Sequence, residues 1–304
     1  MIKLVVIADD LTGALDTGVQ FTKKNLSVAV TPNINLDFEK EFSDMDIVVI
    51  DTESKHIPGK EAKEKVRAVI SKFSKNKIQF FYKKTDSTLR GNIGSELEGF
   101  MEGLGINELS FIPAFPSSKR TVKNGVLYVD NVKLEESSFA HDILNPIKDS
   151  YIPNILKKQT ELKTGVINID NLVSEQYPKT NIYLFDSENN RDMKRIGKEL
   201  FKRDLLNYTA GNAGFAEFLA EYIKSENTPQ NILISDKRIF FVCGSVNIVS
   251  LEQCKTAEEI GFLSKELKFK DIVSEEYLLS NNYFNDKEFI NNGFETTETV
   301  LKNI

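Results

Sequence analysis

The sequence lacks the features that define several protein classes. Its 304 residues include two histidines and two cysteines, and Cys243 and Cys254 are too far apart to form a C-x-x-C pair. These numbers support neither a disulfide scaffold nor a zinc site, and we expect no metal bound by side chains. No apolar run reaches the roughly 18–20 residues of a membrane span. The apolar start, Met1–Ala8, lacks a small-residue cleavage pattern, so it indicates a buried strand in a cytoplasmic protein without membrane contact.

The chain also lacks an excess of basic residues. Lys and Arg number 39 against 45 Asp and Glu, which gives a formal charge of −6. A protein that binds nucleic acid through a basic face needs the opposite balance, so no nucleic-acid partner is expected. Hydrophobic residues make up 40% and charged residues 28% of the chain, as is ordinary for a soluble globular protein.

Short apolar runs rich in Val, Ile and Phe alternate with longer amphipathic stretches. This alternation predicts an α/β fold with a mostly parallel sheet and helices on both faces. In the first helix, Leu15, Val19 and Phe21 are expected roughly on one side, and residues 125–131 are expected to form a hairpin. The expected strands are Met1–Ala8, Ser27–Val30, Ile47–Asp51, Ile78–Tyr82, Leu109–Ile112, Ile182–Phe185 and Ile239–Cys243; the expected helices cover about 12–24, 59–75, 93–103, 187–203, 212–224 and 248–261.

A polar stretch, Ser225–Asp236, interrupts this pattern and is typical of a linker. We therefore expect a first domain over residues 1–228 and a second over residues 237–304. The second holds one clear strand, one helix and a tail rich in Asn, Glu and Lys, too little to bury a convincing core by itself. It is interpreted as a short, incomplete second α/β segment: either it packs on the first domain or the chain stops inside a domain, and we favour the second.

Two neighbouring carboxylates, Asp9 and Asp10, follow the first strand directly. The carboxyl ends of strands in open α/β sheets face the ligand crevice. Adjacent carboxylates repel each other, and burying either one is costly without a cationic or hydroxyl partner. One of them can cap the following helix, which leaves the other to accept ligand hydroxyls or to act as a base. A weaker alternative is a hydrolase that uses both carboxylates, which would show Mg²⁺-dependent phosphatase activity.

A second polar segment follows the expected strand Ile78–Tyr82. Lys and Arg suit a carboxylate or a phosphate, Arg in a bidentate manner. Glycine and asparagine before the next helix could open its N-terminus toward an anion. A solvated charged turn is the minority interpretation. The segment runs Lys83, Lys84, Thr85, Asp86, Ser87, Thr88, Leu89, Arg90, Gly91 and Asn92.

Other strand ends carry weaker signals. Asp51–His56 could reach the same crevice, with His56 expected to be a surface or loop residue. For Arg120 two roles stay open, charge in the pocket or an ordinary surface arginine. Gly211 suits close packing better than a phosphate loop, whereas Gly244 and Ser245 could lie near a phosphate. The G-x-x-x-x-G-K-[ST] pattern of P-loop enzymes does not occur.

Taken together, these segments resemble the four-carbon acid sugar kinase family, bacterial enzymes that phosphorylate threonate, erythronate or their oxidised relatives with ATP. The matching segments occur in family order over about residues 3–260, and KKTDSTLRGN is the most specific. The sequence departs from the family where Lys55 replaces a usual Arg, Lys119 a usual Gly and Ser137 a usual Thr. The segments are ADDLTGA, DTESKH, KKTDSTLRGN, IPAFPSSKRT with NGVLYV, SFAHD, TAGNAGFAE and CGSVN.

The resemblance implies a sugar-acid domain followed by a nucleotide domain, with catalysis in the cleft between them. Asp10 is the candidate for orienting or deprotonating the attacked hydroxyl, and Lys84 and Arg90 for anchoring the substrate carboxylate or the transferring phosphate. Gly244 and Ser245 are the candidates for contacting ATP, with Mg²⁺ on its phosphates. The implied sugar-acid contacts are Asp9, Asp10, Lys55, Lys84, Thr85, Asp86, Ser87 and Arg90.

The resemblance therefore implies a transferase, an ATP-dependent kinase of a four-carbon acid sugar. The family's glycine-rich nucleotide loops have no counterpart in this sequence, so we expect a truncated member with impaired phosphoryl transfer. The alternative is a protein that binds the acid without turnover. A homo-oligomeric state is left open.

Overall fold

The computed structural model describes residues 2–141, 146–225, 243 and 248–264. The chain divides into two compact units, Met1–Gln230 and Asn231–Ile304. In the second unit the described helix is α8, Ile248–Glu259. Of the expected strand Ile239–Cys243 only Cys243 is described, and the expected domain limits, 1–228 and 237–304, stay a prediction.

The first unit is built on a parallel sheet, which confirms the predicted α/β class. Eight described strands lie in the order β2-β3-β1-β4-β11-β5-β10-β9, and each neighbouring pair is parallel. Every residue of β1, β3 and β4 is buried, as expected for strands covered on both faces. In sheet order the strands are β2 Val28–Thr31, β3 Ile47–Asp51, β1 Leu4–Ala8, β4 Phe80–Lys84, β11 Tyr208–Gly211, β5 Leu109–Ile112, β10 Ile182–Phe185 and β9 Thr164–Ile167.

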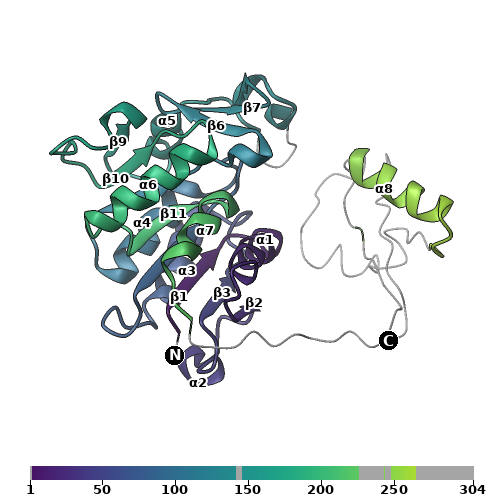
Figure 1. The fold of residues 1–304 in the computed structure, drawn as a ribbon, viewed down its shortest axis with the longest axis horizontal. Helices are drawn as coiled ribbons and strands as arrows, with labels where there is room; N and C mark the ends of the chain where they lie inside the picture. The colour runs from purple at the N-terminus through teal and green to yellow at the C-terminus, as the bar shows by residue number, and fades with distance from the viewer. Residues whose placement is uncertain (1, 142–145, 226–242, 244–247, 265–304) are drawn as a thin grey trace. The chain divides into compact units, whose positions relative to one another are not determined.

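The helices of this unit form two groups. Helices α1, α6 and α7 contact one another in sequence α1–α7–α6, and α3, α4 and α5 do so as α3–α4–α5. Figure 1 shows α6 and α7 crossing one face of the sheet. The bounds are α1 Leu11–Thr22, α2 Phe38–Glu41, α3 Gly59–Ile70, α4 Ile93–Leu104, α5 Ile152–Lys157, α6 Asn190–Lys202 and α7 Ala213–Leu219.

The strand order explains this grouping. Parallel crossovers are almost always right-handed, so connections that run in opposite directions along the sheet place their helices on opposite faces. The chain moves one way from β1 through α1 to β2, and the other way from β4 through α4 to β5. Neighbouring strands β1 and β4 therefore send their helices to opposite faces. In open α/β sheets, ligands bind at such a switch point, outside the carboxyl ends of the strands, and this place at β1 and β4 is called the crevice below.

A small antiparallel sheet is inserted after β5. It contains β6 Arg120–Lys123, β7 Val126–Val129 and β8 Val132–Lys133. Residues 125–131, expected to form one hairpin, instead contain strand β7 between two tight turns, one at Asn124 and Gly125 and one at Asp130 and Asn131. All four turn residues have positive φ, the conformation that suits two-residue hairpin turns.

The expected apolar side of the first helix was wrong. Phe21 is fully buried, but Leu15 and Val19 are about half exposed. At 100° per residue, Phe21 lies about 160° around the helix from Val19 and about 120° from Leu15, so the three do not share a side. Small and polar residues complete the buried side of α1, among them Gly13 and Thr17.

Some elements were missed or given different bounds. Strands β9 and β11 and helix α5 were not expected, and Thr209–Gly211 belongs to a strand rather than to a helix entry. Helix α3 ends at Ile70 instead of about residue 75. No helix in the described part of the chain is long and apolar enough to span a membrane.

Candidate functional site

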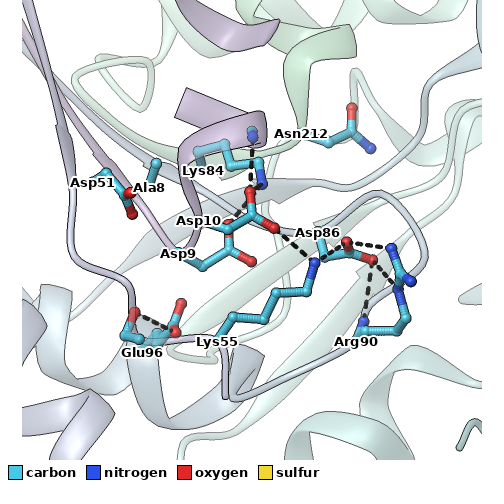
Figure 2. A network of polar contacts seen from close by, with 12 residues as sticks. Ala8, Asp9, Asp10, Asp51, Lys55, Lys84, Asp86, Arg90, Glu96 and Asn212 are labelled. Atoms are coloured by element: carbon cyan, nitrogen blue, oxygen red, sulfur yellow. Dashed lines mark hydrogen bonds and ion pairs between the residues drawn. The ribbon is translucent and has the colours of Figure 1, made fainter. Parts of the chain in front are cut away.

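The polar segments predicted from the sequence meet at the switch point. Asp9 and Asp10 follow β1, Lys84 ends β4, and Asp86 and Arg90 lie in the β4–α4 loop. Lys55 comes from the loop after β3, the other neighbour of β1. Figure 2 shows their side chains directed toward one another.

Asp10 both caps α1 and joins two lysines. Its Oδ1 accepts a hydrogen bond from the Gly13 amide at 2.7 Å and lies 3.2 Å from Lys84 Nζ, and its Oδ2 lies 2.7 Å from Lys55 Nζ. Burial by itself would raise the pKa of Asp10, but Lys84, Lys55 and the Gly13 amide lower it to about 2. The carboxylate is therefore ionised at neutral pH. The sequence left open which carboxylate caps the helix; Asp10 does so, and the same side chain contacts both lysines.

Asp9 and Lys84 form a deeply buried ion pair at this edge. Lys84 Nζ lies 2.7 Å from Asp9 Oδ1, and the side chains are 6% and 1% exposed. The second oxygen of Asp9, Oδ2, is buried and has no hydrogen-bond partner in the described structure. Burial opposes the charge on Lys84, yet Asp9 and Asp10 raise the pKa of its ammonium group well above the usual value. Lys84 therefore stays charged.

Lys55 and Arg90 hold Asp86. Lys55 Nζ lies 2.7 Å from Asp86 Oδ1, and the Arg90 guanidinium approaches both carboxylate oxygens, with Nη2 3.0 Å from Oδ1 and Nε 3.2 Å from Oδ2. Thr88 donates its amide and its hydroxyl to Asp86 Oδ2. Burial raises the pKa of Asp86, but Arg90 and Lys55 outweigh it and keep that pKa far below its usual range.

A second ion pair lies on the same strand. Lys83 Nζ lies 2.7 Å from Glu96 Oε2, and both side chains are fully buried. Lys83 also donates to the Lys84 carbonyl, and Ser54 donates to Glu96 Oε1 at 2.7 Å. Burial raises the pKa of Glu96. The Lys83–Glu96 pair thus joins β4 to α4, and through Ser54 it also holds the loop after β3. Lys55 is the next residue in that loop.

Two glycines are needed for close approach. A Cβ on Gly13 would lie 1.7 Å from Lys84 Nζ, so the lysine reaches the start of α1 only because that position has no side chain. Gly91 has a φ of 87°, and a Cβ there would lie 2.9 Å from the Lys55 carbonyl oxygen. Asn92 then donates to the Ser54 and Ile57 carbonyls, which ties the Lys55 loop to the start of α4.

The other predicted site residues have different surroundings. Thr85 is fully buried, and its hydroxyl has no hydrogen-bond partner among the described residues, whereas Ser87 is half-buried. Gly244 and Ser245, the expected ATP contacts, lie outside the described residues. Arg120 on β6 is half-buried and contacts the ring of Phe139.

Sequence reasoning missed several supporting groups. The pairing of Lys83 with Glu96 was not expected, because the two residues are thirteen positions apart on different elements. The charged pair of lysines at the end of an otherwise apolar strand was the signal that could have indicated it. The role of Gly13 was also missed, since nothing in the local sequence shows that Lys84 passes there.

The described residues do not form a metal site. No group of three or more His, Cys, Asp or Glu side chains within the described ranges is arranged to hold a metal ion. The carboxylates at the crevice are instead paired with Lys55, Lys84 and Arg90. Among the described residues no cluster therefore matches a metal site made of protein side chains alone.

Comparison with known proteins gives consistent relatives. The model of the "sugar-binding N-terminal domain" family matches residues 4–219. A D-erythronate kinase of Heliobacterium modesticaldum is 28% identical over 270 residues, which cover 85% of this chain and 61% of the relative. A D-threonate kinase of Salmonella typhimurium is 29% identical over 268 residues, 84% of this chain and 60% of the relative. The chain thus spans about 60% of the length of these curated relatives.

A solved structure agrees with the fold. A domain of unknown function from Bordetella bronchiseptica, crystallised as a domain-swapped dimer with bound citrate, superposes with a TM-score of 0.63 at 26% identity. The alignment covers 72% of this chain and 56% of the Bordetella chain. With the family match over residues 4–219 and the two kinase relatives, the chain belongs to the four-carbon acid sugar kinase family through its sugar-binding N-terminal domain.

Proposed function

We propose that the crevice at β1 and β4 binds a four-carbon sugar acid of the threonate or erythronate type. The observation that carries the proposal is the closed network of Asp9, Asp10, Lys55, Lys84 and Asp86 at a switch point. Buried carboxylates accept hydrogen bonds from sugar hydroxyls, and buried ammonium groups donate to them. The relatives named D-erythronate and D-threonate kinase support this choice of ligand. So does the citrate in the Bordetella structure, since citrate is also a hydroxylated carboxylic acid.

We further propose that the protein containing this domain is a kinase. In the reaction a hydroxyl oxygen of the acid forms a bond to the γ-phosphorus of ATP, the bond from that phosphorus to the β,γ-bridging oxygen breaks, and ADP leaves. Asp10 accepts the hydrogen bond of the attacking hydroxyl and so orients it. A carboxylate with a pKa of about 2 is a weak base, which favours orientation over early proton removal. This fits phosphoryl transfer, in which positioning and electrostatics contribute most of the catalysis.

ATP and Mg²⁺ enter this proposal through the resemblance to kinases. Mg²⁺ in kinases is usually held by phosphate oxygens and one or two carboxylates. No step above goes through the metal. Gly244 and Ser245 stay the proposed nucleotide contacts.

A coupled ATPase assay with D- and L-threonate and D- and L-erythronate tests the proposal. ADP release that depends on one of these acids is the expected result, and Asp10→Asn should abolish it while Glu64→Gln, in an exposed surface pair, should not. Thermal stabilisation by an acid without ADP release would instead leave the protein as a non-catalytic sugar-acid-binding protein. Neither stabilisation nor turnover with any of the four acids would overturn the proposed ligand class.

A cytoplasmic location and a homo-oligomeric state also remain proposals. The Bordetella relative was crystallised as a domain-swapped dimer. Sedimentation velocity of the full chain measures its own oligomeric state.

A further inference from the structure

The cations at the crevice are already matched by carboxylates. Lys84 is paired with Asp9 and Asp10, and Lys55 with Asp10 and Asp86. Arg90 forms its bidentate contact with Asp86. Three carboxylates thus face three cations, and a ligand that brings its own negative charge needs a further cation. This differs from the expectation that Lys84 and Arg90 anchor the carboxylate.

Arg120 is placed to supply that charge. Its guanidinium lies 5.5 Å from the centre of the Phe139 ring, and the Arg90 guanidinium lies 5.9 Å from the same ring. The two arginines come from different elements, the small sheet and the β4–α4 loop. Phe139 therefore brings Arg120 to the end of the network that Arg90 and Asp86 form.

Arg120 also has an unused donor. Nη1 donates to the Ser118 carbonyl, but Nε is buried and has no hydrogen-bond partner among the described residues. A buried donor without an acceptor is destabilising, and a bound acceptor would remove that cost.

Carboxylates from three elements act on the charge of Arg120. Burial lowers the pKa of its guanidinium, the positive charge of Arg90 lowers it further, and the carboxylates of Asp86, Asp130 and Asp16 act against both. Asp16 belongs to α1 and Asp86 to the β4–α4 loop.

We propose that Arg120 binds the carboxylate of the sugar acid, with Phe139 holding its guanidinium in place, while Asp10 and Lys84 bind the hydroxyl end. The inference rests on the proposed function and adds to it the residue that separates acids from neutral sugars. It also sets the direction of the ligand: the carboxylate lies toward β6 and the hydroxyl to be phosphorylated lies toward α1.

Isothermal titration of the full chain with D- and L-threonate, D- and L-erythronate and the neutral tetritols D-threitol and erythritol tests this assignment. The wild type should bind an acid more tightly than its tetritol. Arg120→Gln should weaken acid binding about 10- to 100-fold, the range for a lost charged hydrogen bond, and leave tetritol binding unchanged. Arg120→Lys keeps the positive charge but not the forked geometry of the guanidinium, so its affinity for the acid should lie between that of the wild type and that of Arg120→Gln. The matched control is Lys119→Gln, which removes a positive charge from the neighbouring, 77% exposed side chain and should change nothing.

The outcomes separate this inference from the proposed function. If the wild type binds an acid and Arg120→Gln binds it equally well, or loses acid and tetritol to the same extent, Arg120 has a structural role only and the inference is wrong. If the wild type binds none of the D- and L-forms of the two acids, the proposed ligand is wrong and the inference fails with it. Because Arg120 also packs on Phe139, thermal unfolding of each variant confirms that it is folded; should Arg120→Gln not fold, the Arg120→Lys comparison decides the question.

Discussion

Asp10 is the residue at which the charges of the site meet, since it contacts Lys55, Lys84 and the start of α1. Replacing it with Asn keeps the helix cap and removes the negative charge. We expect Asp10→Asn to weaken acid-sugar binding by about 10- to 100-fold, because a hydrogen bond to a charged acceptor is lost. Titration calorimetry measures the change. Unaltered affinity would show that the ligand hydroxyls bind elsewhere.

Gly13 allows a second prediction at this scale. An alanine within a helix normally gains about 0.5–1 kcal/mol over glycine. Here the added methyl group would meet Lys84 Nζ at 1.7 Å, so the lysine must move away from the buried Asp9 carboxylate. We expect Gly13→Ala to destabilise the protein and to weaken acid binding, as measured by urea unfolding and titration.

The matched control lies in the same helix. A Cβ on Gly18 would approach a valine methyl group at 3.3 Å and would touch no charged group. Gly18→Ala should leave acid binding intact. An equal loss of acid binding in Gly13→Ala and Gly18→Ala would mean that any added methyl group in α1 weakens binding, whether or not it displaces Lys84.

Which residues gather at the crevice could be predicted from the sequence to a large extent. Asp10, Lys84 and Asp86 each follow a strand that the apolar pattern indicated, and parallel strands bring their carboxyl ends to one edge. How these residues pair could not be predicted, because it depends on side-chain paths such as that of Lys84 past Gly13. For the same reason Arg120 was left between two interpretations.

At the scale of elements, the fully buried Lys83–Glu96 pair joins β4 to α4. Removing one partner leaves an unpaired charge in the core, which typically costs about 3–5 kcal/mol. We expect Glu96→Gln to destabilise the protein by that order and the double variant Lys83→Met/Glu96→Leu to be clearly more stable than Glu96→Gln. Urea unfolding followed by circular dichroism gives both values. If Lys83→Met/Glu96→Leu is less stable than Glu96→Gln, the unpaired charge of Lys83 is not what destabilises Glu96→Gln.

The elements also show where apolar patterns succeed and fail. Strands β1, β3 and β5 are mainly apolar runs, and their positions were predicted closely. Strand β11 contains Ala210 and Gly211, which are depleted in strands, and it is stabilised by lying between β4 and β5. Helix α1 buries small residues while Leu15 stays exposed, so its apolar residues alone indicated the wrong side.

At the scale of the whole molecule, the site makes stability depend on pH. The pKa of Asp10 falls from an ordinary 3.8 to about 2 on folding, and that of Asp86 is also lowered. A carboxyl group whose pKa is lowered by folding contributes its full stabilisation above its unfolded pKa and loses it as the pH falls through the folded one. The free energy of unfolding should therefore fall between about pH 4 and about pH 2, as the Asp10 values require.

Urea unfolding from pH 6 downward measures this loss. Asp10→Asn should show a smaller fall than the wild type over the same interval, because it has one such group fewer. Glu64→Gln, at an exposed pair, is the control and should follow the wild type. Parallel curves for all three proteins would show that Asp10 is not the group whose ionisation stabilises the fold.

The binding of a sugar acid between β1 and β4 is the claim on which the rest of the account depends. A crystal structure of the full chain grown with saturating D-threonate or D-erythronate tests it most directly. We expect the acid at the carboxyl ends of these strands, with a hydroxyl in hydrogen-bond contact with Asp10 and with the carboxylate on Arg120. Electron density for the acid at any other place, or an unaltered and ligand-free network at saturating acid, would contradict the account.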